Sequence, residues 1–207
     1  MEILRLVTGP IQENCYLIYN KENLLIVDPG AEPEKIILQI EKLQRKPVAI
    51  LLTHTHYDHI GAVDPLRDYY QIPVYVSPLE QDWLQDPQMN LSGLGRHDDI
   101  ADVLVRPAEY LFELKDYTLG DMRFSVVATP GHSIGSVSFI FDDFVVSGDA
   151  LFRGSIGRTD LATGNLDQLL TSIKTQLFTL PKQFPVYPGH GDATTIEREI
   201  TTNPFFN

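Results

Sequence analysis

One short segment constrains this chain more than any other feature of its sequence. Residues 53–59 read THTHYDH, so three imidazoles and a carboxylate fall within six consecutive positions. The segment directly follows residues 48–52, an apolar run that is typical of a strand buried on both faces. Polar side chains are costly to hold beside a buried strand unless they are used. A solvated histidine-rich turn is the alternative interpretation, and the rest of the chain argues against it.

Three more potential metal ligands follow apolar, strand-like runs later in the chain. They occur in the motifs TPGH, SGD and YPGH, and a glycine stands immediately before each ligand. Glycine lets the backbone turn sharply, and loops at strand ends often carry active sites. Five of the six histidines fall in these motifs, and only His97 does not. The pattern therefore predicts a metal site built by His54, His56, Asp58, His59, His132, Asp149 and His190.

The charge of the chain narrows the classes of partner. There are 16 Lys and Arg residues against 28 Asp and Glu, which leaves a formal net charge of −12. Nucleic acid and anionic membranes are therefore not expected as partners, because both bind clustered cations. Cys15 is the single cysteine, so no intramolecular disulfide can form. No basic region leads into a long apolar run near the N-terminus, so we expect a cytoplasmic protein without a signal peptide.

Apolar periodicity predicts two similar halves, each a run of strands followed by a helix and another strand. We expect one domain over residues 1–207 with an α/β (α+β) fold, in which two antiparallel-rich sheets faced by helices form a four-layer αββα sandwich. Pro33 starts a helix that Pro47 closes, and Asn165 caps a later helix. The expected strands are 3–7, 16–19, 24–27, 48–52, 74–76, 124–127, 137–141, 144–146 and 185–187, with a helix over 62–70 and a long loop over 83–107.

The chain resembles the metallo-β-lactamase superfamily and, within it, a short single-domain form of the glyoxalase II (hydroxyacylglutathione hydrolase) branch. The matching motifs are THTHYDH, TPGHS, SGDALF followed by GRTD, and YPGH, spaced between GPIQENCYLIY and NPFF. The resemblance implies the metallo-β-lactamase fold and two divalent metal ions. In that family pattern the first metal is held by His54, His56 and His132, the second by Asp58, His59 and His190, and Asp149 bridges them.

The same resemblance implies a hydrolytic reaction. Imidazole and carboxylate ligands suit zinc, iron or manganese, of which zinc is expected first. Two divalent ions, two aspartates and a bridging hydroxide leave a charge of roughly +1, which would stabilise an oxyanion. The hydroxide would attack a small-molecule thioester of the S-lactoylglutathione type, whose thiolate leaving group needs little protonation. Asp58, on the side of the second metal, is the candidate catalytic residue.

Several positions depart from the glyoxalase II pattern. Asp160 and Asp192 stand where the family has tyrosines, and Arg158 stands where it has a lysine that faces glutathione. Only 17 residues follow His190, so we do not expect the C-terminal helical domain that helps to hold glutathione. Arg158 has two interpretations: it binds a substrate carboxylate through two hydrogen bonds, or it pairs with Asp160.

Two other activities fit the same motifs. Residues 148–160, GDALFRGSIGRTD, resemble persulfide dioxygenases at least as closely as they resemble two-domain glyoxalases. Those enzymes hold one iron with two histidines and a carboxylate, which here are His54, His132 and Asp149. A lactonase or another ester hydrolase of the superfamily is the third alternative. The sequence leaves the metal, the acyl group, the thiol carrier and the oligomeric state open.

Overall fold

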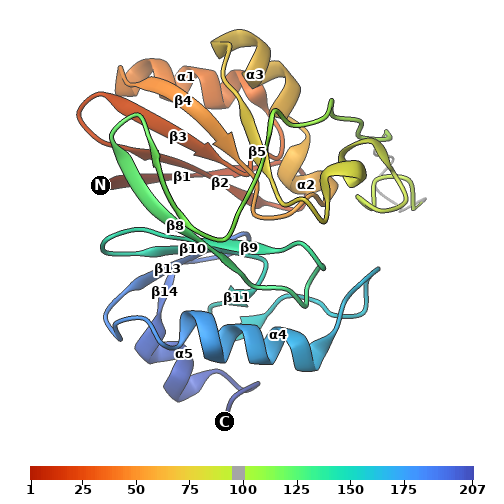
Figure 1. Cartoon of the computed structure of the whole chain (residues 1–207), viewed down its shortest axis with the longest axis vertical. Helices are drawn as coiled ribbons and strands as arrows, with labels where there is room; N and C mark the ends of the chain where they lie inside the picture. The colour runs from red at the N-terminus through yellow and green to blue at the C-terminus, as the bar shows by residue number, and fades with distance from the viewer. Residues whose placement is uncertain (95–100) are drawn as a thin grey trace. The chain divides into compact units, whose positions relative to one another are not determined.

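The computed structural model describes residues 1–94 and 101–207, and the chain divides into two compact units. Unit 1 comprises Met1–Phe112 and Leu119–Met122, and unit 2 comprises Glu113–Thr118 and Arg123–Asn207. Each unit carries a sheet and helices of its own (Figure 1). Within the described residues, none of the helices has the length and apolar character that a membrane span requires.

Unit 1 is built on a mixed sheet. In its described part the strands are β1 (Glu2–Thr8), β2 (Glu13–Tyr19), β3 (Asn23–Val27), β4 (Lys46–Leu51), β5 (Val74–Val76) and β6 (Tyr110–Leu111), and the helices are α1 (Pro33–Leu43), α2 (Tyr57–Ile60), α3 (Val63–Tyr70) and a 3-10 turn at Gln81–Gln85. The strand order is β1-β2-β3-β4-β5-β6. The first three strands are antiparallel, and β3 to β6 pair in parallel. Parallel neighbours need crossover connections, which α1 and the α2–α3 stretch supply.

Helix α1 shows how the local sequence sets its ends. Pro33 is its first residue, where a missing N–H leaves no hydrogen bond unmade. The helix ends at Leu43 because Gln44 adopts the left-handed conformation and its N–H bonds back to the Ile40 carbonyl. The expectation that Pro47 closes this helix is wrong, because Pro47 already belongs to β4.

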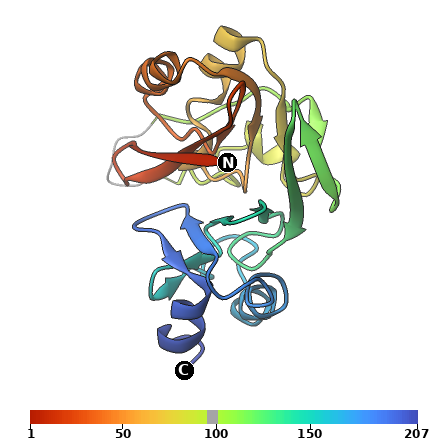
Figure 2. The same cartoon turned by 90° about the vertical axis from the view of Figure 1, so that its left-hand side faces the viewer.

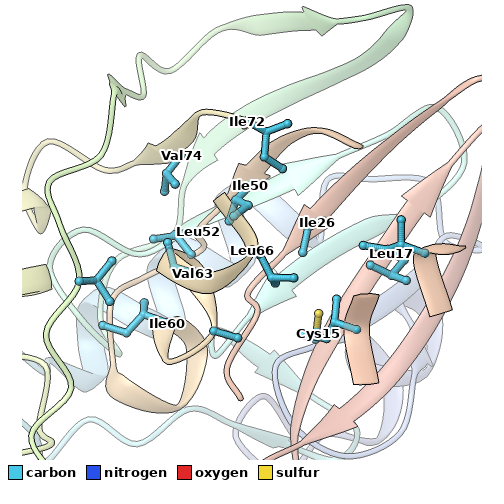
Figure 3. Packing of buried hydrophobic residues seen from close by; sticks show 14 of the residues in the cluster. Cys15, Leu17, Ile26, Ile50, Leu52, Ile60, Val63, Leu66, Ile72 and Val74 are labelled. Carbon is cyan, nitrogen blue, oxygen red and sulfur yellow. The ribbon is translucent and has the colours of Figure 1, made fainter. Parts of the chain in front are cut away.

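One face of the unit 1 sheet carries a hydrophobic core. Leu17, Ile26 and Ile50 come from three neighbouring strands, and all three are fully buried. They share a face because Leu17 is paired with Ile26 and Ile26 with Ile50, and paired residues point to the same side of the sheet. Val63 and Leu66 of α3 belong to the same buried cluster (Figure 3). The packed helices therefore hold the strand ends, from which the candidate ligands emerge, in a fixed arrangement.

The second sheet lies almost wholly in unit 2. In the described chain its strands are β7 (Asp116–Leu119), β8 (Met122–Ala128), β9 (Val137–Ile140), β10 (Val145–Gly148), β13 (Pro185–Pro188) and β14 (Thr194–Thr195), and β11 (Leu151–Phe152) pairs separately with β12 (Ser155–Ile156). The strand order is β14-β13-β10-β9-β8-β7. Two helices accompany the sheet: α4 (Leu166–Ser172), which continues as a π-helix over Ile173–Leu177, and α5 (Ile196–Thr202). Figure 2 shows α5 in blue, close to the C-terminus.

The helices of unit 2 follow the sequence pattern in part. The Asn165 side chain accepts a hydrogen bond from the Gln168 N–H at 2.9 Å, so the predicted cap is confirmed. The predicted apolar stripe is also confirmed in its buried members Leu169, Ile173 and Leu177. Helix α5, which was not predicted from the sequence, adds Ile196 to the same core.

Candidate metal centre

The histidine-rich segment runs from the end of β4 into α2. His54 and His56 lie in the loop that follows β4, and Asp58 and His59 lie in α2. The three histidines are at most 3% exposed, and Asp58 is half-buried. The His54 ring centroid lies 4.6 Å from that of His56 and 4.2 Å from that of His59. Unit 1 therefore gathers three buried imidazoles side by side, as the sequence predicts.

Asp28 holds this segment from a position directly after β3. Its carboxylate accepts hydrogen bonds from the Thr53 N–H at 2.7 Å, from the Thr53 hydroxyl at 2.6 Å and from His59 Nδ1 at 3.0 Å. Asp28 is 1% exposed and has a φ of +48°, a left-handed conformation in which Asp is enriched. One atom each of Asp28, His54 and His59 lie within 4.8 Å of one another. A buried carboxylate thus supports the first and the last histidine of the motif.

These contacts decide the tautomers of two histidines. The Asp28 carboxylate can only accept, so we place the proton of His59 on Nδ1. The single hydroxyl proton of Thr53 goes to Asp28, so the Thr53 oxygen accepts from His54 Nδ1 at 3.1 Å. In the neutral form of both rings, Nε2 then carries the lone pair that a metal ion would take.

Two further buried carboxylates border the segment. Glu80 is fully buried and accepts from the N–H and the hydroxyl of Thr55, at 2.8 and 3.0 Å. Glu13 accepts from the Thr8 hydroxyl at 2.7 Å, and its other oxygen lies 3.9 Å from His59 Nδ1. Burial raises the pKa of Glu13 well above its ordinary value, and His59 opposes this shift. The segment is therefore held at two threonines, Thr53 by Asp28 and Thr55 by Glu80.

In unit 2, Asp149 lies beside two of the predicted histidines. Its Oδ2 is 3.5 Å from His132 Nε2 and 3.7 Å from His190 Nε2. His132 Nδ1 donates to the backbone carbonyl of Arg158 at 2.8 Å. A carbonyl only accepts, so His132 also carries its proton on Nδ1 and presents the Nε2 lone pair toward Asp149.

Two glycines make this arrangement possible. Gly131 has a φ of +130°, and a Cβ at this position would lie 2.3 Å from the Leu169 backbone nitrogen. A Cβ on Gly157 would lie 1.9 Å from the Asp149 backbone oxygen and 3.1 Å from His132 Nδ1. Any larger residue at either position would displace the backbone that places His132 beside Asp149.

Arg158 pairs with Asp160 on the surface. Its Nε and Nη2 donate to the two Asp160 carboxylate oxygens at 2.9 and 2.8 Å. Their side chains are 62% and 68% exposed. The hydrogen bonds from Arg158 are the largest cause that lowers the pKa of Asp160 from 3.8 to about 2. A substrate carboxylate would therefore have to displace Asp160 before it could bind the same edge of the guanidinium.

The sequence-predicted residues thus form two sets. His54, His56, Asp58 and His59 lie together in unit 1, and His132, Asp149 and His190 lie together in unit 2, while His97 lies outside the described residues. The supporting roles of Asp28, Thr53 and Glu80 were not predicted from the sequence. Asp28 carried the same signal as the ligands, a polar residue directly after an apolar strand. Glu80 carried no such signal, because nothing in the local sequence shows that it reaches Thr55.

Comparison with known proteins shows the family. The family model of the Metallo-beta-lactamase superfamily matches residues 8–190. The chain belongs to this superfamily. A probable metallo-hydrolase of Streptococcus pyogenes serotype M6 is 52% identical over 211 residues, which cover 100% of this chain and 91% of that protein. The hydroxyacylglutathione hydrolase GloC of Haemophilus influenzae is 35% identical over 202 residues, which cover 95% of this chain and 93% of that protein.

Solved structures agree with this assignment. The B3 metallo-beta-lactamase BLEG-1 matches with a TM-score of 0.95 and 44% identity over 100% of both chains. TTHA1623 in a di-iron-bound form matches with a TM-score of 0.84 and 39% identity over 98% of this chain and 99% of that one. ETHE1 from Myxococcus xanthus matches with a TM-score of 0.77 and 32% identity over 99% of this chain and 84% of that one. The expected metallo-β-lactamase fold is confirmed, and the family together with the donor groups supports a metal-dependent enzyme of the metallo-hydrolase type.

Proposed function

We propose that this superfamily member is a thioester hydrolase of the glyoxalase II-like type, and that its seven predicted ligands hold two divalent metal ions. The observation that supports the proposal most strongly is the contact that Nδ1 makes in three histidines. His54, His59 and His132 each have Nδ1 engaged by a hydrogen-bonding partner, so each offers Nε2 for coordination. The proposed division of ligands is His54, His56 and His132 for one ion and Asp58, His59 and His190 for the other, with Asp149 shared.

The donor set fits a cation better than it fits a hydrogen-bonded core. The His132 Nε2 lone pair lies 3.5 Å from an Asp149 carboxylate oxygen. Two acceptors at this distance repel each other unless a cation or a proton lies near them. Histidines that bind metals almost always donate their other ring N–H to a carboxylate or a backbone carbonyl, as His59 and His132 do. Zinc is the metal that we propose first, and iron is the main alternative because TTHA1623 has a di-iron form.

The residues of the chain would orient the ligands and balance charge. When bound, the ions would activate water at neutral pH and polarise the thioester carbonyl. Asp28 and the Arg158 carbonyl fix the ring orientation of His59 and His132, and Asp58 and Asp149 supply negative charge against the cations. A thiolate leaving group needs no proton from the chain, so a thioester suits a site whose predicted ligands include no dedicated general acid.

The proposal is tested by assaying metal-analysed protein with two substrates while oxygen is followed. We expect hydrolysis of S-lactoylglutathione without oxygen uptake, at about two metal ions per chain. Oxygen consumption with glutathione persulfide, at about one iron per chain, would contradict the proposal and would favour a persulfide dioxygenase.

A second candidate is β-lactam hydrolysis, which the 44% identity to BLEG-1 favours. The same activated water would attack the lactam carbonyl. The nitrogen of the opened ring must be protonated, whereas a thiolate leaves as an anion, so the two reactions differ in their need for a general acid. A penicillin assayed beside the thioester separates them: a larger kcat/KM for the penicillin would move the assignment to β-lactam hydrolysis.

A further inference from the structure

Unit 1 contains a cavity beside the histidine-rich segment. Its volume is about 260 Å³. One wall is the turn between β1 and β2, another is the loop after β3, and a third is the start of α2. The lining residues include Pro10, Ile11, Ala31, Tyr57, Asp58 and Val103. Most of this lining is apolar, in contrast to the charged surface of the chain.

The turn that forms one wall is held in place. Gly9 has a φ of +65°, and its N–H donates to Glu32 at 3.1 Å. Lys35 donates to the Val7 carbonyl at 2.7 Å and lies 3.3 Å from Glu32. Glu32 also lines the cavity, so its negative charge at the rim is balanced by Lys35. The turn is therefore tied to Glu32 and to α1, and the cavity offers no unbalanced positive charge to an anionic ligand.

The wall at the start of α2 belongs to the proposed metal centre. Tyr57 and Asp58 line the cavity, and the Asp58 carboxylate lies 3.4 Å from His59 Nε2. The backbone is packed tightly here, because a Cβ on Gly30 would stand 1.7 Å from the Asp58 backbone oxygen. A group in the cavity would thus lie directly beside Asp58, which is a proposed metal ligand.

We propose that this cavity receives the acyl group of the thioester and selects neutral, apolar acyl chains of about six carbons. This inference rests on the proposed thioesterase function and names its substrate class. An apolar cavity of about 150 Å³ is known to hold a benzene molecule, so 260 Å³ accommodates a six-carbon chain. The balanced charge of Glu32 and Lys35 gives no attraction for a second carboxylate on the acyl group.

The experiment uses N-acetylcysteamine thioesters from acetyl to hexanoyl, because this small carrier adds no charge. Burial of one methylene is worth roughly a two- to fourfold gain, so kcat/KM should rise by about this factor per carbon. The Ala31 Cβ already faces the turn, 3.4 Å from where a Cβ on Gly9 would stand. Ala31→Leu adds three carbons to the cavity and should lower the preference for hexanoyl over acetyl by roughly 8- to 60-fold.

Two further variants keep the test sound if Ala31→Leu fails to fold. Ile11 is 40% exposed on the turn, so Ile11→Ala should leave the fold intact and weaken the chain-length dependence. Leu38 is a matched control, since it is 50% exposed on α1 and does not line the cavity; Leu38→Ala should keep the wild-type dependence. A wild-type protein with no chain-length preference, or a preference that Ile11→Ala and Ala31→Leu leave unchanged, overturns the inference.

Binding of S-alkyl N-acetylcysteamine thioethers, measured by calorimetry, separates this inference from the proposed function. These probes cannot be hydrolysed, so they report on the cavity alone. Affinity that rises from S-methyl to S-hexyl and falls in Ala31→Leu supports the cavity even if no thioester is turned over. If thioesters are turned over but all the thioethers bind with equal affinity, the proposed thioesterase function stands and the proposed acyl-binding role of the cavity is contradicted.

Discussion

Asp28→Asn is the substitution for which the structure gives the sharpest expectation. Oδ2 of Asp28 accepts from the Thr53 hydroxyl and from His59 Nδ1. An amide NH2 in this place can only donate, so the His59 proton must move to Nε2. The Thr53 oxygen then accepts from Asn and gives its own proton to His54 Nδ1, which shifts the proton of His54 to Nε2 as well. One substitution therefore blocks the coordinating nitrogen of two proposed ligands without changing either histidine.

The magnitude follows from the role of such supporting residues. Loss of one hydrogen-bonding partner behind a metal-binding histidine typically costs 10- to 100-fold in metal affinity. Two histidines are affected here, so we expect metal affinity to fall by about 100-fold or more. A 100-fold loss corresponds to about 2.7 kcal/mol of binding free energy. Asn has nearly the volume of Asp and tolerates the left-handed conformation at a φ of +48°, so the fold should survive.

The assay has two readouts. Competition with a chelator gives metal affinity, and long-range 1H–15N correlation spectra of the metal-free protein give the histidine tautomers. We expect Nδ1–H for His54 and His59 in the wild type and Nε2–H in Asp28→Asn, with unchanged circular dichroism. Asp64→Asn is the control, because Asp64 pairs with Arg67 in the same unit and contacts no histidine in the described hydrogen bonds. Wild-type tautomers together with a metal affinity within twofold of the wild type would refute the reasoning.

Three other expectations follow from the site. Metal-replete protein should contain about two ions per chain by elemental analysis, and a value that stays near one on titration would speak for the dioxygenase. Asp58→Ala should lose metal from one site and most of its thioester turnover while the strands stay folded. The control His97→Ala should keep its metal content and its turnover. Wild-type turnover in Asp58→Ala would exclude Asp58 as a ligand. Asp160 has a depressed pKa, so its pairing contributes stability above its unfolded pKa of about 3.9, and this contribution is lost as the pH falls through about 2. Carbonyl 13C titration should show that midpoint, and it should return toward 3.8 in Arg158→Ala.

The sequence predicted the elements that bury continuous apolar runs. The strands β3 and β4 and the helices α1 and α3 all lie within one or a few residues of the expected ranges, because periodic burial leaves a local signal. Helix α2 left no such signal, since its four residues include Asp58 and His59, whose placement serves the site. Helix α5 has only seven residues. Its main local signal is Thr195, whose hydroxyl caps the helix by accepting a hydrogen bond from the Arg198 N–H.

The candidate ligands lie in motifs that the sequence alone reveals, whereas most of the residues that support them left no local signal. Each candidate ligand belongs to a recognisable motif that lies at or just after the end of a strand, so its position is local information. The support of Thr53 by Asp28 spans 25 residues, and that of Thr55 by Glu80 spans 25 residues in the other direction. Such contacts depend on the parallel pairing of β3, β4 and β5, which brings strand ends together only in the folded sheet.

The pairing of Arg158 with Asp160 turns an open question into a pair of opposed predictions. Asp160 occupies Nε and Nη2 of Arg158, the same edge that a substrate carboxylate would use. If Arg158 binds a carboxylate-bearing thiol carrier, Asp160 competes with the substrate. Arg158→Ala should then raise KM for that substrate by roughly 10- to 150-fold with kcat nearly unchanged, because the lost contact is made equally in the ground and transition states.

Asp160→Ala should act in the opposite direction if that interpretation holds. With its competitor removed, the guanidinium is available to the substrate, so KM for the carboxylate-bearing thioester should fall below the wild-type value. A neutral thioester serves as the control substrate, since neither variant should change its KM. The backbone carbonyl of Arg158 still holds His132 in both variants, so metal content should stay at the wild-type level. Equal kinetics on both substrates in both variants would leave Arg158 as a surface partner of Asp160, because removal of a true competitor cannot be silent.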